Sequence, residues 1–187
     1  MKLSNTFFAL LALAMLLAAP ALAGCAPAQV SANPQLDAIH AIRKQLELPD
    51  LALTFVEKTG MINSPAGNLE VAVYQDSAGR KYSVDPVNNQ VVEIDARVIL
   101  SGHGPDAPGL AADQLKARAL KYIKAAIPDF DTLQSSWQYE EGTKGDNYFY
   151  TWSRPIAPGA MNRPFAQLAL YKTGEVFAYY NTLLLDK

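Results

Sequence analysis

Residues 84–94 read VDPVNNQVVEI, and residues 169–179 read ALYKTGEVFAY. Both stretches place a short polar turn between two runs rich in β-branched and aromatic residues, which is typical of a β-hairpin. When the turns are aligned, Asn89 and Gly174 occupy the same position, and both residue types tolerate the left-handed backbone of tight turns. The alignment predicts that the chain contains two structurally matched halves.

A predicted amphipathic helix opens each half. The first covers residues 34–48, with Asn33 as its cap, Pro49 as its stop and Arg43 on its polar side. Its apolar residues recur at helical spacing, and they are Leu36, Ile39, Ile42 and Leu46. The second helix begins near Asp113 and ends before Pro128, and its apolar stripe holds Leu115, Ala119, Tyr122, Ile123 and Ala126. A Pro-Asp pair follows both helices and leads into strand-like sequence.

The strand predictions follow from alternating hydrophobicity and turn residues. In the first half they cover 51–57, 69–75, 80–84 and 90–94, with a loop at 63–68 and a turn at 76–79. In the second half they cover 132–139, 147–153, 165–171 and 175–182, with a turn at Glu140-Glu141-Gly142. The predicted fold class is therefore α+β, with two tandem units at 34–100 and 111–187. Each unit is one helix packed on an antiparallel sheet of about four strands, and the Gly- and Pro-rich residues 101–110 form the linker.

The order of elements and the hairpin pattern V-D-P-x-x-N-x-V-V resemble the PepSY domain of bacterial envelope proteins and protease propeptides. The second half is also similar to the YcdB/YcdC-type repeat, a relative of PepSY, in its helix ending in Pro-Asp and its Thr-Gly-Glu-Val hairpin. Asn88-Asn89 stands where the family usually has Thr-Gly, and Leu170-Tyr171-Lys172 where it has Asp-Pro-Lys. The resemblance implies a sheet packed on a helix, no catalytic residues, and a role in binding or restraining peptidases or other envelope proteins.

Residues 1–24 have the layout of a secretory signal, and Cys25 is the only cysteine of the chain. One interpretation is ordinary cleavage after Ala23, with Cys25 incidental. The sequence Leu22-Ala23-Gly24-Cys25 also resembles the bacterial lipobox, which implies cleavage by signal peptidase II between Gly24 and Cys25 and acylation of the Cys25 sulfur. Acyl chains on that residue would anchor the protein in the bilayer of the cell membrane or outer membrane. Residues 25–33 are then a short tether, and the domain lies outside the cytoplasm.

Composition argues against several other functions. The formal net charge is −2 and no basic block occurs, so we expect no nucleic-acid partner. His40 and His103 are the only histidines, and they lack the spacing of a metal site, so neither metal nor cofactor is expected. No G-x-S-x-G motif is present. Asp129 and Asp131 are predicted to be solvated, and nothing in the sequence indicates a catalytic cleft around the pair Glu140/Glu141. The sequence therefore predicts a protein that is not an enzyme.

Aromatic residues are concentrated in the second half, where 12 of the 18 fall after residue 129. On the predicted strand 147–153, Tyr148, Tyr150 and Trp152 share one face, and Phe149 and Thr151 share the other. The first face either packs beneath the helix as core or is exposed as a binding platform. We take Trp137, Tyr148, Tyr150 and Trp152 as candidate contacts for a protein or peptide partner. The alternative is a glycan or another small ligand stacked on the same aromatic side chains.

Overall fold

Eight strands pair into one antiparallel sheet in the order β1-β2-β3-β4-β8-β7-β6-β5. The strands of the first half are β1 (Leu53–Ser64), β2 (Gly67–Asp76), β3 (Lys81–Val84) and β4 (Val91–Asp95). Those of the second are β5 (Gln138–Lys144), β6 (Asn147–Ser153), β7 (Phe165–Tyr171) and β8 (Val176–Asn181). The two sets of four join where β4 pairs with β8, Ile94 lying opposite Tyr179. The chain therefore has a mixed α+β fold with one antiparallel sheet.

The computed structural model describes residues 33–65, 67–100, 108–159, 161–183 and 185, and residues 33–187 form one compact unit. The predicted signal peptide 1–24, Cys25 and all but the last residue of the tether lie outside the described residues. The same holds for His103 and for most of the linker 101–110. What was predicted for these residues stays a prediction.

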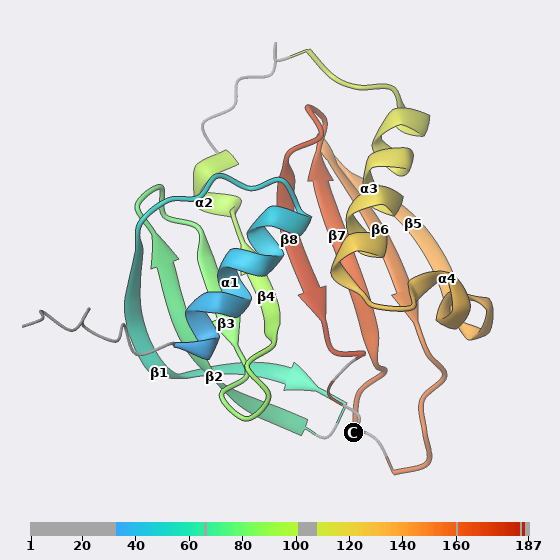
Figure 1. Ribbon diagram of the computed structural model, residues 1–187. Helices are drawn as coiled ribbons and strands as arrows, with labels where there is room; N and C mark the ends of the chain where they lie inside the picture. Colours follow the sequence, from blue (N-terminus) through green and yellow to red (C-terminus); the bar gives the residue numbers. More distant parts are fainter. Residues whose placement is uncertain (1–32, 66, 101–107, 160, 184, 186–187) are drawn as a thin grey trace, which may run out of the picture. The chain divides into compact units, whose positions relative to one another are not determined.

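Two main helices lie against one face of the sheet, α1 (Pro34–Gln45) and α3 (Ala112–Ala126) (Figure 1). As predicted, the Asn33 side chain caps α1 by accepting from the backbone N–H groups of Gln35 and Leu36. The helix ends three residues earlier than predicted, because Glu47 adopts a left-handed backbone with φ 54°. A one-turn helix, α2 (Arg97–Leu100), also follows β4 and was not predicted.

The matched turns predicted from the sequence are confirmed. Asn89 has φ 57° and Gly174 has φ 89°, so both positions are left-handed. The first turn is one residue longer, because Asp85 N–H bonds to Gln90 O at 2.9 Å whereas Tyr171 N–H bonds to Glu175 O at 2.9 Å.

The predicted strand 132–139 is wrong except for its last two residues. Residues 132–136 lie in α4 (Phe130–Leu133) and a short 3-10 helix, η1 (Gln134–Ser136), whereas Gln138 and Tyr139 begin β5. The hydroxyls of Ser135 and Ser136 bond back to carbonyl groups three residues earlier, and these local bonds compete with an extended chain. The predicted turn at Glu140-Glu141-Gly142 is also wrong, since all three residues lie inside β5.

The predicted loop 63–68 is much tighter in the structure. β1 continues to Ser64 and β2 starts at Gly67, so most of the segment is strand. Gly67 has φ 115°, and the Ser64 hydroxyl donates to the Gly67 carbonyl at 2.7 Å. A glycine at this backbone angle lets the chain reverse in few residues.

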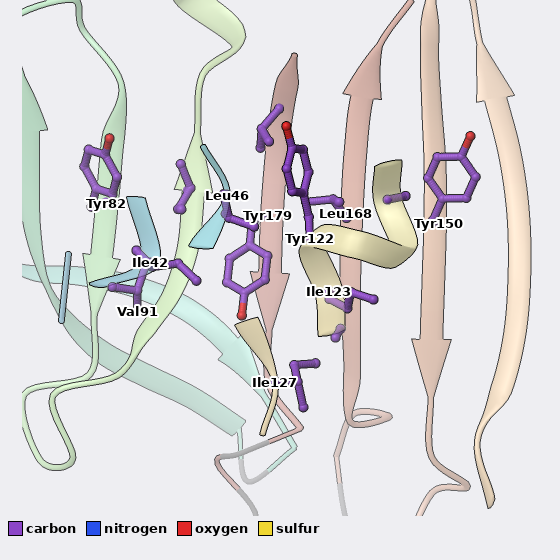
Figure 2. Packing of buried hydrophobic residues seen from close by; sticks show 14 of the residues in the cluster. Ile42, Leu46, Tyr82, Val91, Tyr122, Ile123, Ile127, Tyr150, Leu168 and Tyr179 are labelled. Carbon is purple, nitrogen blue, oxygen red and sulfur yellow. The ribbon is translucent and has the colours of Figure 1, made fainter. Parts of the chain in front are cut away.

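The main hydrophobic core lies between the two helices and the sheet (Figure 2). Ile42 and Leu46 enter it from the first helix region, and Tyr122 and Ile123 enter it from α3. They meet buried side chains of β3, β4, β6, β7 and β8, which include Tyr82, Val91, Tyr150, Leu168 and Tyr179. The core is continuous across both halves, which explains why the two sets of strands form one unit.

Arg43 is buried, contrary to its predicted place on the polar side of the first helix. It is 1% exposed, and its Nε donates to the Tyr82 hydroxyl at 2.9 Å. Its Nη1 donates to Leu51 O at 2.8 Å, and its Nη2 lies 3.6 Å from the Asp76 carboxylate. Asp76 also pairs with Arg80 at 2.8 Å. Helical periodicity missed this residue because a charged side chain is seldom buried unless it is paired.

Candidate binding site on the open face of the sheet

One face of the sheet is covered by the helices, and the opposite face is not. Tyr148, Tyr150 and Trp152 point toward the helices and join the main core. Because side chains alternate along a strand, Phe149 and Thr151 point to the opposite face. We call this opposite side the open face. Both residues are partly exposed there.

Part of the open face is covered by the far end of the β1–β2 hairpin, Gly60–Ser64 with Gly67–Val71, which we call the arm. Irregular pairing between Phe55 and Gly60 bends β1 at the base of the arm. At the tip, Met161 N–H bonds to Pro65 O at 2.9 Å and Asn162 Nδ2 bonds to Ser64 O at 2.7 Å. Figure 1 shows the hairpin turned across the sheet toward the β6–β7 connection. The tip is thereby tied to the second half.

A second, smaller hydrophobic cluster packs between the arm and the open face of the sheet. It consists of Val71, Val73 and Val92, with Ile62, Leu69 and Leu185 packed against it. Leu69, Val71 and Val73 alternate along β2 and therefore share one face of the strand, which is the open one. The first half thus covers much of its open face with its own hairpin.

A pocket of about 500 Å³ lies where the arm meets the open face. The arm contributes Ile62 and Asn63, and the β6–β7 connection contributes Asn162 and Arg163. The sheet contributes residues of β4, β7 and β8 together with the residue that follows β8, and these are Glu93, Phe165, Tyr180 and Thr182. The pocket therefore combines two aromatic rings, two amides and opposite charges.

A row of side chains crosses the open face through this pocket, each directly opposite the next in the strand pairing. The register pairs Glu93 with Tyr180, Tyr180 with Gln167, Gln167 with Thr151 and Thr151 with Glu140. Directly paired residues of antiparallel strands point to the same face. At about 4.8 Å between strands, the row from Glu93 to Glu140 spans roughly 19 Å. It runs from β4 to the edge strand β5.

Hydrogen bonds tie members of this row together. Gln167 Nε2 donates to Thr151 Oγ1 at 2.9 Å, and the Ser83 hydroxyl donates to Glu93 Oε2 at 3.1 Å. Burial, followed by hydrogen bonding to Glu93, raises the pKa of Tyr180 well above its usual value. Like any tyrosine, Tyr180 is protonated at neutral pH, and its hydroxyl bonds to the Glu93 carboxylate as a donor.

Aromatic pairs flank the row on both sides. The rings of Phe165 and Tyr180 are 6.3 Å apart and tilted by 37°, and they lie at the pocket. Phe149 and Phe177 meet edge to face at 6.5 Å on the other side of the row. All four side chains are partly exposed. Such rings supply flat apolar contact area to a ligand that also bonds to the polar row.

The aromatic residues predicted to bind a partner do not lie on this face. Tyr150 and Trp152 are each 3% exposed, and Phe130 meets the Trp152 ring edge to face at 5.5 Å. Trp137 and Tyr148 are half-buried and pack against the same core. The interpretation of Tyr150 and Trp152 as surface contacts is therefore corrected to a core role, whereas a partner contact by the half-buried Trp137 or Tyr148 stays a prediction. The reason is that α3 and α4 cover this end of the sheet.

The sequence analysis missed Glu93, Phe165, Gln167 and Tyr180 as a site. They come from three strands, and one sequence does not show the register that aligns them. One signal was present, because aromatic side chains occur on both faces of the strand 147–153. That pattern indicates a second face with its own role.

Other candidates lie apart from the pocket. His40 is exposed, and its Nδ1 lies 2.9 Å from Asp50 Oδ1. Asp129 and Asp131 are exposed as predicted, and Asp131 pairs with Lys124. Within the described ranges, no group of three or more His, Cys, Asp or Glu is close enough to hold a metal ion. Every helix in the described part of the chain is too short or too polar to traverse a bilayer.

No family model, curated protein or solved structure matches this chain.

Proposed function

We propose that the protein is a membrane-anchored envelope lipoprotein that binds a protein or peptide partner without catalysis. The anchor is Cys25, which becomes the N-terminal residue after cleavage between Gly24 and Cys25 and is then acylated. The lipobox-like sequence supports this part of the proposal. The binding surface is the open face of the sheet, from the arm pocket across the polar row to β5. A peptidase held in check by such binding fits the PepSY resemblance.

The observation that carries this proposal is the row Glu93–Tyr180–Gln167–Thr151 with aromatic rings on either side. Polar groups in register supply bonds for a polypeptide, and partly exposed rings supply apolar contact. Of the described residues that line the pocket, Glu93 is the only carboxylate. General acid–base chemistry of the two-carboxylate kind needs a second one nearby. The composition of the pocket therefore favours recognition over catalysis.

The proposed domain organisation is two tandem PepSY-like units joined edge to edge through β4 and β8. The same order of one helix and four antiparallel strands in each half supports it. The left-handed residues at the same position of each last hairpin support it further. In this organisation, only the second unit leaves most of its open face free for a partner.

Site-directed photo-crosslinking in cells of the source bacterium tests the binding role with the full-length chain. A benzophenone amino acid replaces Phe149 on the open face or, as the matched control, Val87 in the exposed β3–β4 turn. We expect discrete protein adducts from position 149 and none of the same mass from position 87. The same adducts from both positions, or none from position 149, would reject the open face as a protein-binding surface.

The anchor is tested separately with Cys25→Ala. We expect wild-type protein to take up labelled palmitate and to sediment with membranes. The variant should do neither. Palmitate uptake by the variant would contradict acylation of Cys25.

A glycan is the second candidate ligand, because aromatic rings beside amide and carboxylate groups also suit a sugar. Asn63, Asn162 and Glu93 lie around Tyr180 in the pocket and would bond to sugar hydroxyls.

A further inference from the structure

We propose that the pocket beneath the arm receives a basic side chain, an arginine or a lysine, from an extended segment of the partner. The cationic group would lie against the Glu93 carboxylate, with its alkyl stem beside Phe165 and Tyr180. This inference rests on the proposed function and names the feature of the partner that the site selects.

The first step is the state of Glu93. It is partly buried, it accepts a hydrogen bond from the Ser83 hydroxyl, and it lies opposite Tyr180. No ion pair joins it to any cation among the described residues. Arg97 acts on Glu93 through space, but its direct ion pair is with Asp95. A carboxylate that is partly removed from water and has no direct ion-pair partner is stabilised by a cationic ligand.

The second step is that the neighbouring guanidinium groups are already engaged. Arg97 bonds to the Asp95 carboxylate through two nitrogens, at 2.8 Å and 2.6 Å. Arg163 lines the pocket, but its Nη1 donates to Gln138 Oε1 at 2.7 Å, toward β5. Neither forms a direct ion pair with Glu93, so its carboxylate can still accept a bond from a cation outside the described chain, although the charge of Arg163 stays in the pocket.

The lining of the pocket beside Glu93 suits the stem of a long basic side chain. Lysine and arginine bury their alkyl stems along apolar surface while the charged group stays polar, and cations are attracted to aromatic faces. The paired rings of Phe165 and Tyr180 and the side chain of Ile62 offer such a wall beside Glu93. A cavity of about 500 Å³ has room for one long side chain.

The fourth step favours a polypeptide over a free amine. From Glu93 the row continues with an amide and a hydroxyl, Gln167 and Thr151, toward the sheet edge. At about 3.3 Å per residue, an extended segment of about six residues would span the roughly 19 Å of this row. Neutral sugars would satisfy the amides but would leave the Glu93 charge unpaired.

The experiment uses the purified full-length chain in detergent micelles and two probe peptides. One is acetyl-Gly-Gly-Arg-Gly-Gly-amide, and the other carries citrulline, the neutral isostere of arginine. Amide NMR shifts of Glu93, Phe165 and Tyr180 report binding. The variants are Glu93→Gln and, as a control with the same charge change, Asp113→Asn, an exposed carboxylate on α3, on the helix-covered side of the sheet. Circular dichroism confirms that each variant is folded.

We expect wild type and Asp113→Asn to bind the arginine peptide about tenfold more tightly than the citrulline peptide, as a charge-assisted bond implies. In Glu93→Gln the two peptides should bind alike. Equal binding of both peptides to wild type would overturn the basic-side-chain inference and leave the proposed peptide role standing. Binding of chitotetraose with no response to either peptide would overturn both in favour of a glycan. If none of the three probes changes the amide shifts, the inference is overturned, and the crosslinking result alone then decides the proposed function.

Discussion

The two halves of the sheet share their order of elements, but each holds its helix by different chemistry. The first helix, α1, is tied to the strands by the buried charges of Arg43, Asp76 and Arg80. The second, α3, enters the core with Leu115, Ala119, Tyr122 and Ile123 and keeps its lysines outside. One topology therefore tolerates two kinds of helix attachment, because only the position of the helix over the sheet is common to both.

The open faces of the two halves differ in how much of each is covered. In the first half, the arm folds back over Val71, Val73 and Val92. In the second half, no described segment comparable to the arm extends beyond β5 to cover Phe149 and Phe177. The half with the covered face has little sheet surface left for a ligand. The candidate pocket therefore lies at the margin of the arm, where Ile62, Asn63 and Glu93 of the first half meet residues of the second half, and the polar row continues over the uncovered face.

The largest expected effect comes from Asp76→Ala. The Asp76 side chain is fully buried and lies between two nearly buried arginines, so its loss leaves two positive charges without their partner. We expect the free energy of unfolding in urea to fall by about 3–5 kcal/mol. Asp95→Ala, which breaks an exposed pair with Arg97, should cost about 1 kcal/mol or less. Equal losses in the two variants would mean that the buried charges do not hold α1.

A triple variant sharpens this prediction. Arg43→Met, Asp76→Leu and Arg80→Met together replace the charges by apolar groups and should recover most of the stability that Asp76→Ala loses. If the triple variant is folded but does not recover this stability, the loss in Asp76→Ala comes from the hydrogen bonds that Asp76 accepts in the turn. The N–H groups of Ala78 and Arg80 both donate to Asp76 Oδ1.

A smaller effect than that of Asp76→Ala is expected at the matched turns. A Cβ at Gly174 would lie 2.4 Å from Arg118 Nη1 and 2.8 Å from Leu110 Cδ1, and φ is 89°. Gly174→Ala should therefore lower the free energy of unfolding by about 1–2 kcal/mol. Asn89→Gly keeps a left-handed backbone and should change it by less than about 1 kcal/mol. A larger loss from Asn89→Gly than from Gly174→Ala would show that the two turns are not equivalent.

The comparison also shows what one sequence predicts well. Strands 147–153 and 165–171 were predicted with the bounds that β6 and β7 have, because apolar residues alternate there between clear turns. The left-handed turn position of the last hairpin was predicted in both halves, because few residue types tolerate that backbone conformation. These are local signals, which a single segment carries by itself.

Features that depend on distant segments were missed. Arg43 looked like a surface residue because its partners, Asp76 and Tyr82, lie more than thirty positions away. The polar row of the open face exists only through the register of β4, β8, β7, β6 and β5. The predicted aromatic site failed because the sequence showed two faces of β6 without showing which one the helix covers.

Alkaline pH offers a smaller and more specific test of the α3 attachment. Burial, followed by the hydrogen bond that Tyr122 donates to Glu47, raises the pKa of Tyr122 from 10.0 to about 12. The fold therefore favours the protonated hydroxyl, and this contribution is fully present below pH 10. It is lost as pH rises from 10 to about 12.

We expect Tyr122→Phe to be less stable at neutral pH and to show a shallower fall in melting temperature between pH 10 and pH 12 than wild type. Other buried tyrosines keep part of the slope in both proteins. An unchanged slope in the variant would contradict a buried, hydrogen-bonded Tyr122. Tyr74→Phe, which removes a hydroxyl bonded to Gln35 on α1, is the matched control from the first half.

The smallest effect is expected on the open face of the second half. Phe149 is partly exposed and its neighbour Tyr150 is buried, so adjacent residues of one strand report the two faces. We expect Phe149→Ala to lower the free energy of unfolding by about 1 kcal/mol or less and Tyr150→Ala by about 3 kcal/mol or more. Urea unfolding of the full-length protein measures both. A loss for Phe149→Ala as large as that for Tyr150→Ala would mean that this face is covered in the free protein. The uncovered half would then resemble the half under the arm, and the candidate site would have no accessible surface for a partner.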